Sequence, residues 1–328
     1  MNDHSTRAET PNAVSTERES FRFSVEHVRL LVPYISFVLI FVFFSTMAFE
    51  YFNTWRNLST ILQQATVLAI VAFGMHFVIS TGSIDLSVGS TLSFAGLVGA
   101  SVSLWGGGPL GIAAALLVGA AVGLCNGMIF TYMKVPSFMV SLGTLMAVQG
   151  LTIVYSRSNP VPIDPSLMSM GGFPNIVYAA IGVFILCYIV YNHTTFGRYC
   201  IAVGGDERVS TISGLPVNLV KVSVFVVSGV LAGFGGIVMA ARLGAATPTA
   251  GTAFELSVIS AVVLGGTPLT GGVGSIQNTV IGALIIAMLG NGLVILGIPS
   301  EIQRIITGVI LILAVFLSLE RGKIGVIK

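Results

Sequence analysis

The chain has 328 residues, of which 54% are hydrophobic and only 9% are charged, and its mean hydropathy is +0.95. A soluble domain carries about 25% charged residues, so this chain has too few charges to cover a water-exposed surface. The net charge of +2 is too small to indicate a nucleic-acid partner, and no basic patch alternates with aromatic residues. The composition therefore indicates an all-α, polytopic membrane protein in contact with lipid.

The N-terminal segment, residues 1–29, is polar and charged and contains no apolar run of the signal-peptide type. We expect it to be a disordered cytoplasmic tail. Residues 320–328 form a second predicted tail at the other end of the chain. Residues 30–319 between the tails form the predicted transmembrane domain.

Ten apolar, charge-poor segments of this domain are about as long as a membrane span requires. The eighth segment is the least distinct, because the uncharged stretch 256–300 is interrupted only by LGGTPLTGGVGS, residues 264–275. That sequence is either a loop or a re-entrant turn buried in protein, and eight or nine spans remain alternatives. The ten predicted spans are 30–49, 61–80, 86–104, 110–133, 138–155, 174–191, 218–240, 253–268, 275–297 and 300–319.

The lysines and arginines are distributed unequally between the two sides of the membrane that ten spans define. Eleven of the fifteen fall on the side of both termini, and Arg56, Arg157, Arg242 and Arg304 fall on the other side. Cytoplasmic loops carry the excess of positive charge, so we expect both termini in the cytoplasm.

Small residues recur within the predicted spans. The 39 glycines include those of VGAAVGLCNG, residues 118–127, and such spacing lets neighbouring helices approach closely. Cys125, Cys187 and Cys200 lie in or beside apolar runs without paired spacing, so they are expected to be small buried side chains. SIDLSVGS (83–90) and TPLTGGVGS (267–275) are weakly similar to each other. The similarity is explained either by two related halves of the chain, which are common in transporters, or by chance.

The longest loop expected on the cytoplasmic side runs from about 192 to 217. Within it, GGDERVSTISGLP predicts a short helix. Asp206 suits the N-cap and Glu207 the first turn, whereas Gly214 suits a left-handed position after the last turn, with Pro216 close behind. Such a short helix is marginal alone in water, so it should pack against something. A plain connector helix at the membrane interface is the alternative.

This loop resembles the coupling loop of bacterial ABC importer permeases of the ribose, xylose and arabinose branch. TGSIDLSVGS (81–90), VPSFMVSLGTL (135–145) and the block 241–276 resemble further motifs of that family in the same order. The resemblance extends from about residue 50 to 319. The matched positions of the loop include Phe196, Gly197, Arg198, Ala202, Gly204, Gly205, Ser213 and Gly214.

The chain departs from the family pattern at a few positions. Asp206 replaces an asparagine, Val209 and Ser210 replace two alanines, and Ser83 replaces a glycine. These changes are small and should preserve docking. A second set of departures lies nearer the expected path and leaves the identity of the substrate open; it comprises His76 for a threonine and Ser257 for an aspartate.

The resemblance implies a permease subunit that pairs with a second copy in a homodimer. Each copy presents its coupling loop to a cytoplasmic ABC ATPase, and an extracytoplasmic sugar-binding protein delivers the substrate. This chain lacks a GxxxxGK[ST] phosphate loop, so ATP and magnesium are expected on the partner ATPase, with no cofactor on this chain. The expected coupling residues are Gly204, Gly205, Asp206, Glu207, Val209, Ser210, Ser213 and Gly214.

Polar residues inside apolar segments are rare in membranes and suggest function. Asp85 either caps the start of the third span or contacts the path or its gate. Glu255 is an interfacial residue or a path residue, and His76 is a buried, hydrogen-bonded imidazole or a path residue. Asn126, Gln149 and Asn291 either bond between helices or contact a sugar. The candidate path or gate residues are therefore His76, Asp85, Asn126, Gln149, Glu255 and Asn291.

The sequence thus favours the permease subunit of an importer for an aldopentose, with hexoses and small polyols next. A secondary transporter or channel that needs no ATPase is the alternative from another class. An intramembrane enzyme would need an acid–base pair or a catalytic triad, and no such arrangement stands out.

Overall fold

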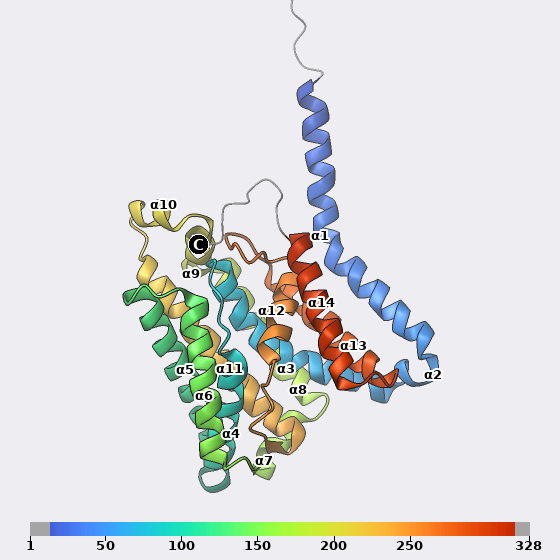
Figure 1. Ribbon diagram of the computed structural model, residues 1–328, viewed down its shortest axis with the longest axis vertical. Coiled ribbons are helices and arrows are strands. Elements are labelled where there is room, and N and C mark those ends of the chain that lie inside the picture. The colour runs from blue at the N-terminus through green and yellow to red at the C-terminus, as the bar shows by residue number, and fades with distance from the viewer. Residues whose placement is uncertain (1–13, 319–328) are drawn as a thin grey trace, which may run out of the picture.

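The computed structural model describes residues 14–318, which are almost entirely helical (Figure 1). The all-α membrane architecture predicted from composition is therefore confirmed. The elements are α1 (Val14–Met47), α2 (Phe49–Phe52), α3 (Trp55–Ser80), α4 (Val88–Gly106), α5 (Gly108–Tyr132), α6 (Ser137–Ser156), β1 (Val161–Pro162), α7 (Pro165–Gly171), α8 (Asn175–His193), α9 (Thr195–Gly205), α10 (Glu207–Ile212), α11 (Val217–Leu243), β2 (Ala245–Ala246), α12 (Phe254–Leu264), α13 (Ile276–Ile295) and α14 (Ser300–Ser318).

Seven of the described helices are long and apolar enough to cross a membrane: α3, α4, α5, α6, α8, α11 and α13. Two further predicted spans coincide with the apolar part of α1, Leu31–Met47, and with α14. The predicted span 253–268 does not coincide with a full-length helix, because α12, the helix at this place, has only 11 residues. A helix of that length is about 16 Å long, roughly half of a hydrocarbon core.

The chain nevertheless crosses the bundle at this point, partly without a helix. After α11, Gly244 adopts a positive φ of 76° and β2 pairs antiparallel with β1. Residues 247–253 then continue without a helix until α12 begins. The loop after α12 lies at the other end of the bundle, where the amide of Gly272 donates to the carbonyl of Ser80 at the end of α3, over 3.0 Å. A non-helical segment followed by a half-length helix thus replaces one full span.

Helix α11 lies at the centre of the bundle and packs against α5, α4 and α3. Glycines allow these contacts: a Cβ atom on Gly229 would collide with the carbonyl of Gly119, and a Cβ on Gly119 with that of Gly229. The predicted close packing through small residues is therefore confirmed for α5 and α11. Helix α3 is buried on every face from Ala65 to Ser80, which suits its apolar sequence.

Two expectations from the sequence are corrected by the fold. Helix α1 begins at Val14, within the segment predicted to be disordered. Residues 14–32 contain no glycine or proline. The helix of the first span therefore extends towards the N-terminus, with one further backbone hydrogen bond for each residue added. Cys187 and Cys200 are buried as predicted, whereas Cys125 is exposed on α5. Residues 1–13 and the predicted tail 320–328 lie outside the described residues.

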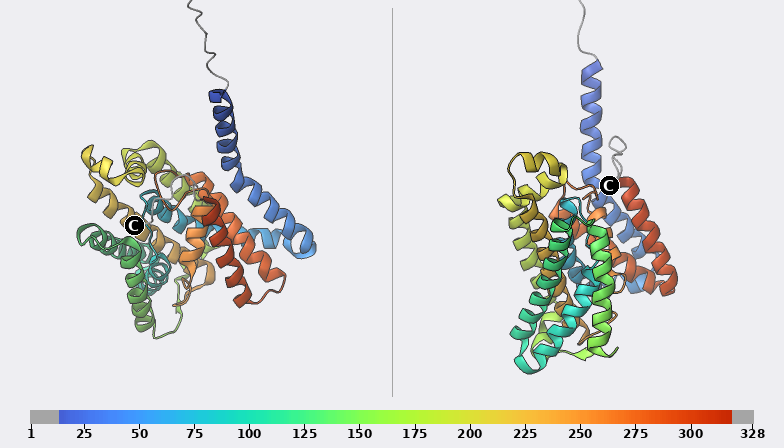
Figure 2. Two further views of the ribbon diagram at one scale, coloured as in Figure 1. Left: turned by 45° about the horizontal axis from the view of Figure 1, so that its top comes forward. Right: turned by 60° about the vertical axis from the view of Figure 1, so that its left-hand side comes forward.

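The two ends of the bundle carry different short elements. Helices α9 and α10, in yellow, lie at one end, and α7 together with the connection between α4 and α5 lies at the other (Figures 1 and 2). Helix α1 contains Pro33, and the bend expected at a proline is visible along α1 in Figure 1.

Candidate functional site

The segment predicted as a cytoplasmic loop, 192–217, is mostly helical. Helix α9 occupies 195–205, because Phe196, Cys200 and Val203 fall on one helical face that packs onto the bundle. The predicted helix follows as α10. The carboxylate of Asp206 accepts the amide of Val209 at 2.9 Å, and Gly214 has a positive φ of 78°. The predicted N-cap and C-terminal glycine are therefore confirmed.

Helix α10 presents apolar side chains away from the bundle. Val209 is 57% exposed and Ile212 is 80% exposed, whereas Ser210 is buried. Residues three apart share a helical face, so Val209 and Ile212 form one exposed apolar surface at the end of the molecule. Ile212 was not among the coupling residues predicted from the sequence. Its position three residues after Val209, on the same helical face, was the signal that could have identified it. Such an apolar face outside the bundle suits a protein partner.

A lysine that the sequence analysis did not identify connects α10 to the bundle. The ammonium of Lys221, on α11, lies 2.5 Å from the carboxylate of Glu207 and 4.7 Å from the ring centroid of Phe130 on α5. The Lys221 side chain is only 13% exposed, whereas that of Glu207 is 54% exposed, so water still screens the pair. Lys221 thereby links the first turn of α10 to both α11 and α5.

Beneath α10, glycine backbones join α9 to α3 and to the loop before α13. The Cα of Gly204 lies against the carbonyl of Ser80 and the amide of Gly272, and Gly272 in turn lies against Gly205. Gly272 also needs its positive φ of 80°, which favours glycine. This glycine junction, formed by Ser80, Gly204, Gly205 and Gly272, connects α9 to the buried end of α3.

We expect Gly204→Val to separate α9 from α3. Its Cβ would overlap the backbone of Ser80 and Gly272, and overpacking of this kind costs about 1–3 kcal/mol. The variant should melt at a lower temperature in detergent. Gly182→Val, on α8, is the matched control, because it adds the same side chain where nothing lies within 4 Å of a Cβ. Equal melting temperatures of the two variants would contradict the junction.

His76 lies beside this junction and is fully buried. Its Nδ1 atom is 3.1 Å from the hydroxyl of Thr279 and 3.3 Å from that of Thr267, and its ring packs edge-on against Tyr191 at 4.6 Å between centroids. Tyr191 in turn bonds Ser80 over 3.1 Å. Of the two alternatives for His76, a buried and hydrogen-bonded imidazole or a path residue, this geometry matches the first.

Asp85 is buried at the centre of a chain of hydrogen bonds. Its Oδ1 accepts from the amide of Ser87 at 3.0 Å and from its hydroxyl at 2.7 Å, and its Oδ2 accepts from Ser228 of α11 at 2.9 Å. Asn126 of α5 donates to the Ser87 hydroxyl at 2.9 Å, and Thr144 of α6 donates to Asn126 at 2.6 Å. The N-cap of α4 is Ser87, so Asp85 orders the turn before the helix rather than capping it.

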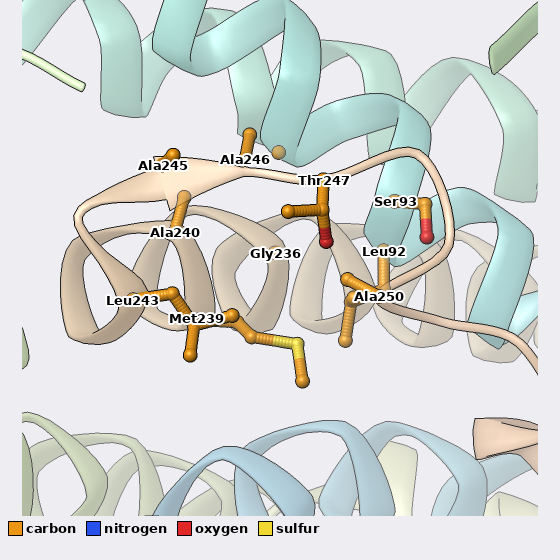
Figure 3. A pocket seen from close by; sticks show the side chains of 11 residues that line it. Leu92, Ser93, Gly236, Met239, Ala240, Leu243, Ala245, Ala246, Thr247 and Ala250 are labelled. Atoms are coloured by element: carbon orange, nitrogen blue, oxygen red, sulfur yellow. The ribbon is translucent and has the colours of Figure 1, made fainter. Parts of the chain in front are cut away.

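Gln149 and Glu255 both lie against the interrupted eighth span. The Gln149 amide donates to the carbonyl of Pro248 at 3.3 Å. The half-buried carboxylate of Glu255 lies beside Gly89, at the start of α4. Figure 3 shows the beginning of the same segment, where Ser93 and Thr247 border a small, mostly apolar pocket between β2, α4 and α11.

The structure therefore brings the six candidate path residues together only in part. Asp85 and Asn126 share one network, Gln149 and Glu255 lie at one segment, and His76 lies beside the glycine junction. Asn291 is nearly buried on α13, and no hydrogen bond within residues 14–318 joins it to the others. In the same described part of the chain, no three His, Cys, Asp or Glu side chains are placed to hold a metal ion.

Comparison with known proteins shows that the chain is similar to membrane permeases. Residues 57–315 match the family described as "Branched-chain amino acid transport system / permease component". The chain is 41% identical over 295 residues to the ribose import permease protein RbsC of Escherichia coli K12, covering 87% of this chain and 92% of the relative. It is 35% identical over 294 residues to the L-arabinose ABC transporter permease protein AraH of Azospirillum brasilense, covering 87% of each chain.

A third relative is the D-allose transport system permease protein AlsC of Escherichia coli K12, 34% identical over 312 residues, which are 93% of this chain and 95% of the relative. No solved structure matches the chain significantly.

Proposed function

Because this chain belongs to the family of permease components of branched-chain-amino-acid-type transport systems, we propose that it forms the membrane path of an ATP-driven importer for an aldopentose. The family description names amino acids, but three relatives that match over nearly their whole length are named for ribose, L-arabinose and D-allose. The high identity to the ribose protein favours a pentose over a hexose. The observation that carries the importer proposal is α10, a capped helix that projects exposed Val209 and Ile212 beyond the bundle.

The proposed assembly contains a second copy of this chain, a cytoplasmic ABC ATPase that binds ATP and magnesium, and an extracytoplasmic sugar-binding protein. The protein lies in the bacterial inner membrane with both termini in the cytoplasm, which agrees with the excess of lysine and arginine on that side. Helix α10 docks on the ATPase through Val209 and Ile212. The pair of Lys221 with Glu207 and the glycine junction transmit its movement into α11 and α3.

The proposed path follows the polar groups inside the bundle. Gln149 and Glu255 line it at the interrupted eighth span, and Asp85 and Asn126 hold α4, α5 and α11 in place around it through their buried hydrogen bonds. His76 and Asn291 support the helices from within the packed interior. Hydroxyl and amide contacts of this kind bind a sugar weakly, which suits a path whose substrate is selected by a separate binding protein.

The substrate is tested by uptake of labelled ribose, xylose, arabinose, galactose, erythritol and myo-inositol. A strain deleted for the gene is compared with the same strain complemented. We expect high-affinity uptake of one aldopentose to be lost and then restored by the gene, but not by a version lacking residues 206–214. Uptake that survives removal of 206–214 would contradict the coupling to an ATPase and favour a secondary transporter.

A further inference from the structure

The non-helical segment of residues 247–253 lies inside the bundle, away from both ends. Gln149, which contacts its Pro248, is near the middle of α6. The amide of Gly251 donates to the hydroxyl of Ser93, in the second turn of α4, at 2.8 Å. The segment therefore lies at a depth where a full-length neighbour such as α6 is surrounded by hydrocarbon.

One side of this segment is open in the single chain. Thr249, Thr252 and Ala253 are exposed, and Thr247 is partly exposed. Non-helical backbone and unpaired hydroxyls cannot face lipid, because lipid offers no hydrogen-bond partners; they occur at this depth only within protein or along a water-filled cavity. The open side of the segment therefore faces something other than lipid.

The start of α4 meets this segment directly. Residues 81–87 separate α3 from α4, and α4 begins at Val88. A Cβ atom on Gly89 would overlap both the carbonyl of Gly251 and the carboxylate of Glu255, so the two backbones touch directly. The start of α4 therefore crosses the non-helical segment directly, and polar groups of a broken span at such a crossing are available to a solute, as in other transporters.

Three polar side chains at this crossing are free to bind a ligand. Within residues 14–318, no side chain donates a hydrogen bond to the Glu255 carboxylate, and the hydroxyls of Thr249 and Thr252 have no partner. Glu255 accepts hydrogen bonds only, whereas threonine hydroxyls donate and accept. This combination suits a neutral molecule with several hydroxyl groups, and it lacks the fixed positive charge that an anion would require.

We propose that Thr249, Thr252 and Glu255 form a contact site for the hydroxyl groups of a neutral sugar within the translocation path. This proposal rests on the proposed function. The carboxylate accepts from one or two sugar hydroxyls, and the two threonines bond the neighbouring hydroxyls. Contact with the second copy of the chain is the competing occupant of the same side.

The first experiment measures which solvent reaches this side. Thr249→Cys and Thr252→Cys, in membranes with the ATPase and binding protein present, are treated with a permanently charged, water-soluble thiol reagent. Leu186→Cys, an exposed apolar position in the middle of α8, is the lipid-facing control, and the unmodified chain gives the background of its three native cysteines. We expect both threonine positions to react at least about tenfold faster than the control, because only they contact water.

The second experiment measures sugar contact. Glu255→Gln and Thr252→Val should lower the maximal rate of aldopentose uptake at least about tenfold, while ATP hydrolysis stimulated by the binding protein stays near that of the unmodified complex. Thr46→Val is the matched control, because that exposed hydroxyl bonds only to carbonyls of its own helix α1. Its uptake should not change.

Three results overturn the site: cysteines at 249 and 252 that react as slowly as Leu186→Cys, cysteines that cross-link to the second copy instead of reacting, or unchanged uptake by Glu255→Gln and Thr252→Val. Failure of the proposed function is distinguishable, because it appears in the unmodified complex as an absence of ATP-dependent sugar uptake. Fast labelling in such a complex would still establish a water-filled path.

Discussion

We expect replacement of Ile212 by aspartate to weaken the association of this chain with its ATPase at least about 30-fold and to lower sugar uptake accordingly. Ile212 is the most exposed apolar side chain of α10, and an apolar anchor of an interface is worth at least about 2 kcal/mol, or roughly 30-fold in affinity. A carboxylate in its place must also be buried without a partner, which adds to the loss. Co-purification of the ATPase with the solubilised permease measures the effect.

Ile212→Leu is the matched control, because it keeps an apolar side chain of the same size and should retain the ATPase. The melting temperature of Ile212→Asp alone should equal that of the unmodified chain, since an exposed side chain contributes little to the fold. Retention of the ATPase by Ile212→Asp at normal stoichiometry would show that α10 is a connector helix, the alternative left open by its sequence.

Replacing Asp85 produces the largest expected loss of stability. In Asp85→Leu, the amide and hydroxyl of Ser87 and the hydroxyl of Ser228 lose their acceptor in a buried site. Each unsatisfied buried donor costs about 1–3 kcal/mol, so the variant should lose several kcal/mol and fail to accumulate. Asp85→Asn keeps one acceptor oxygen and should be destabilised by only about 1–3 kcal/mol.

Thermal unfolding in detergent, followed by intrinsic fluorescence, ranks these variants. Ser228→Ala removes one donor and leaves the other bonds of Asp85 in place, so it should fall between the unmodified chain and Asp85→Leu. If Asp85→Leu is as stable as the unmodified chain and only transport is lost, Asp85 acts on the path and its hydrogen bonds are incidental to the fold.

Local features of the fold could be predicted from the sequence because short-range chemistry determines them. The N-cap at Asp206 and the glycine at 214 need only the sequence of one turn, and both are confirmed. Seven of the predicted spans coincide with described helices long and apolar enough to cross a membrane, since the length of a span is set by the bilayer. Helix α9 was missed because its sequence includes Gly197, Gly204 and Gly205, and glycine is a poor helix former.

Features that depend on distant parts of the chain could not be predicted. The sequence places residues 247–252 between two predicted spans, and only their contacts with Ser93 and Gln149 show that this non-helical segment lies inside the bundle. Lys221 carries no local motif, and its pairing with Glu207 depends on how α10 returns to α11. The partners of Asp85 come from α11 and, through Ser87, from α5, which no spacing in the sequence reveals.

The structure shows where His76 and Ser257, two departures from the family pattern, lie in the bundle. His76, where a threonine is usual, bonds two threonines in the packed interior, so it bears on the glycine junction rather than directly on the open side of residues 249–255. Ser257 lies one turn into α12 and is partly exposed. Of the two departures, Ser257 is therefore the one closer to the proposed sugar contacts.

Reconstitution tests the central claim most directly. The permease is placed in liposomes with its ATPase, the sugar-binding protein is added outside, and ATP is supplied on the ATPase side. We predict accumulation of the aldopentose that requires ATP and the binding protein and disappears when residues 206–214 are deleted. Accumulation driven by an ion gradient without ATP would contradict the account and establish a secondary transporter.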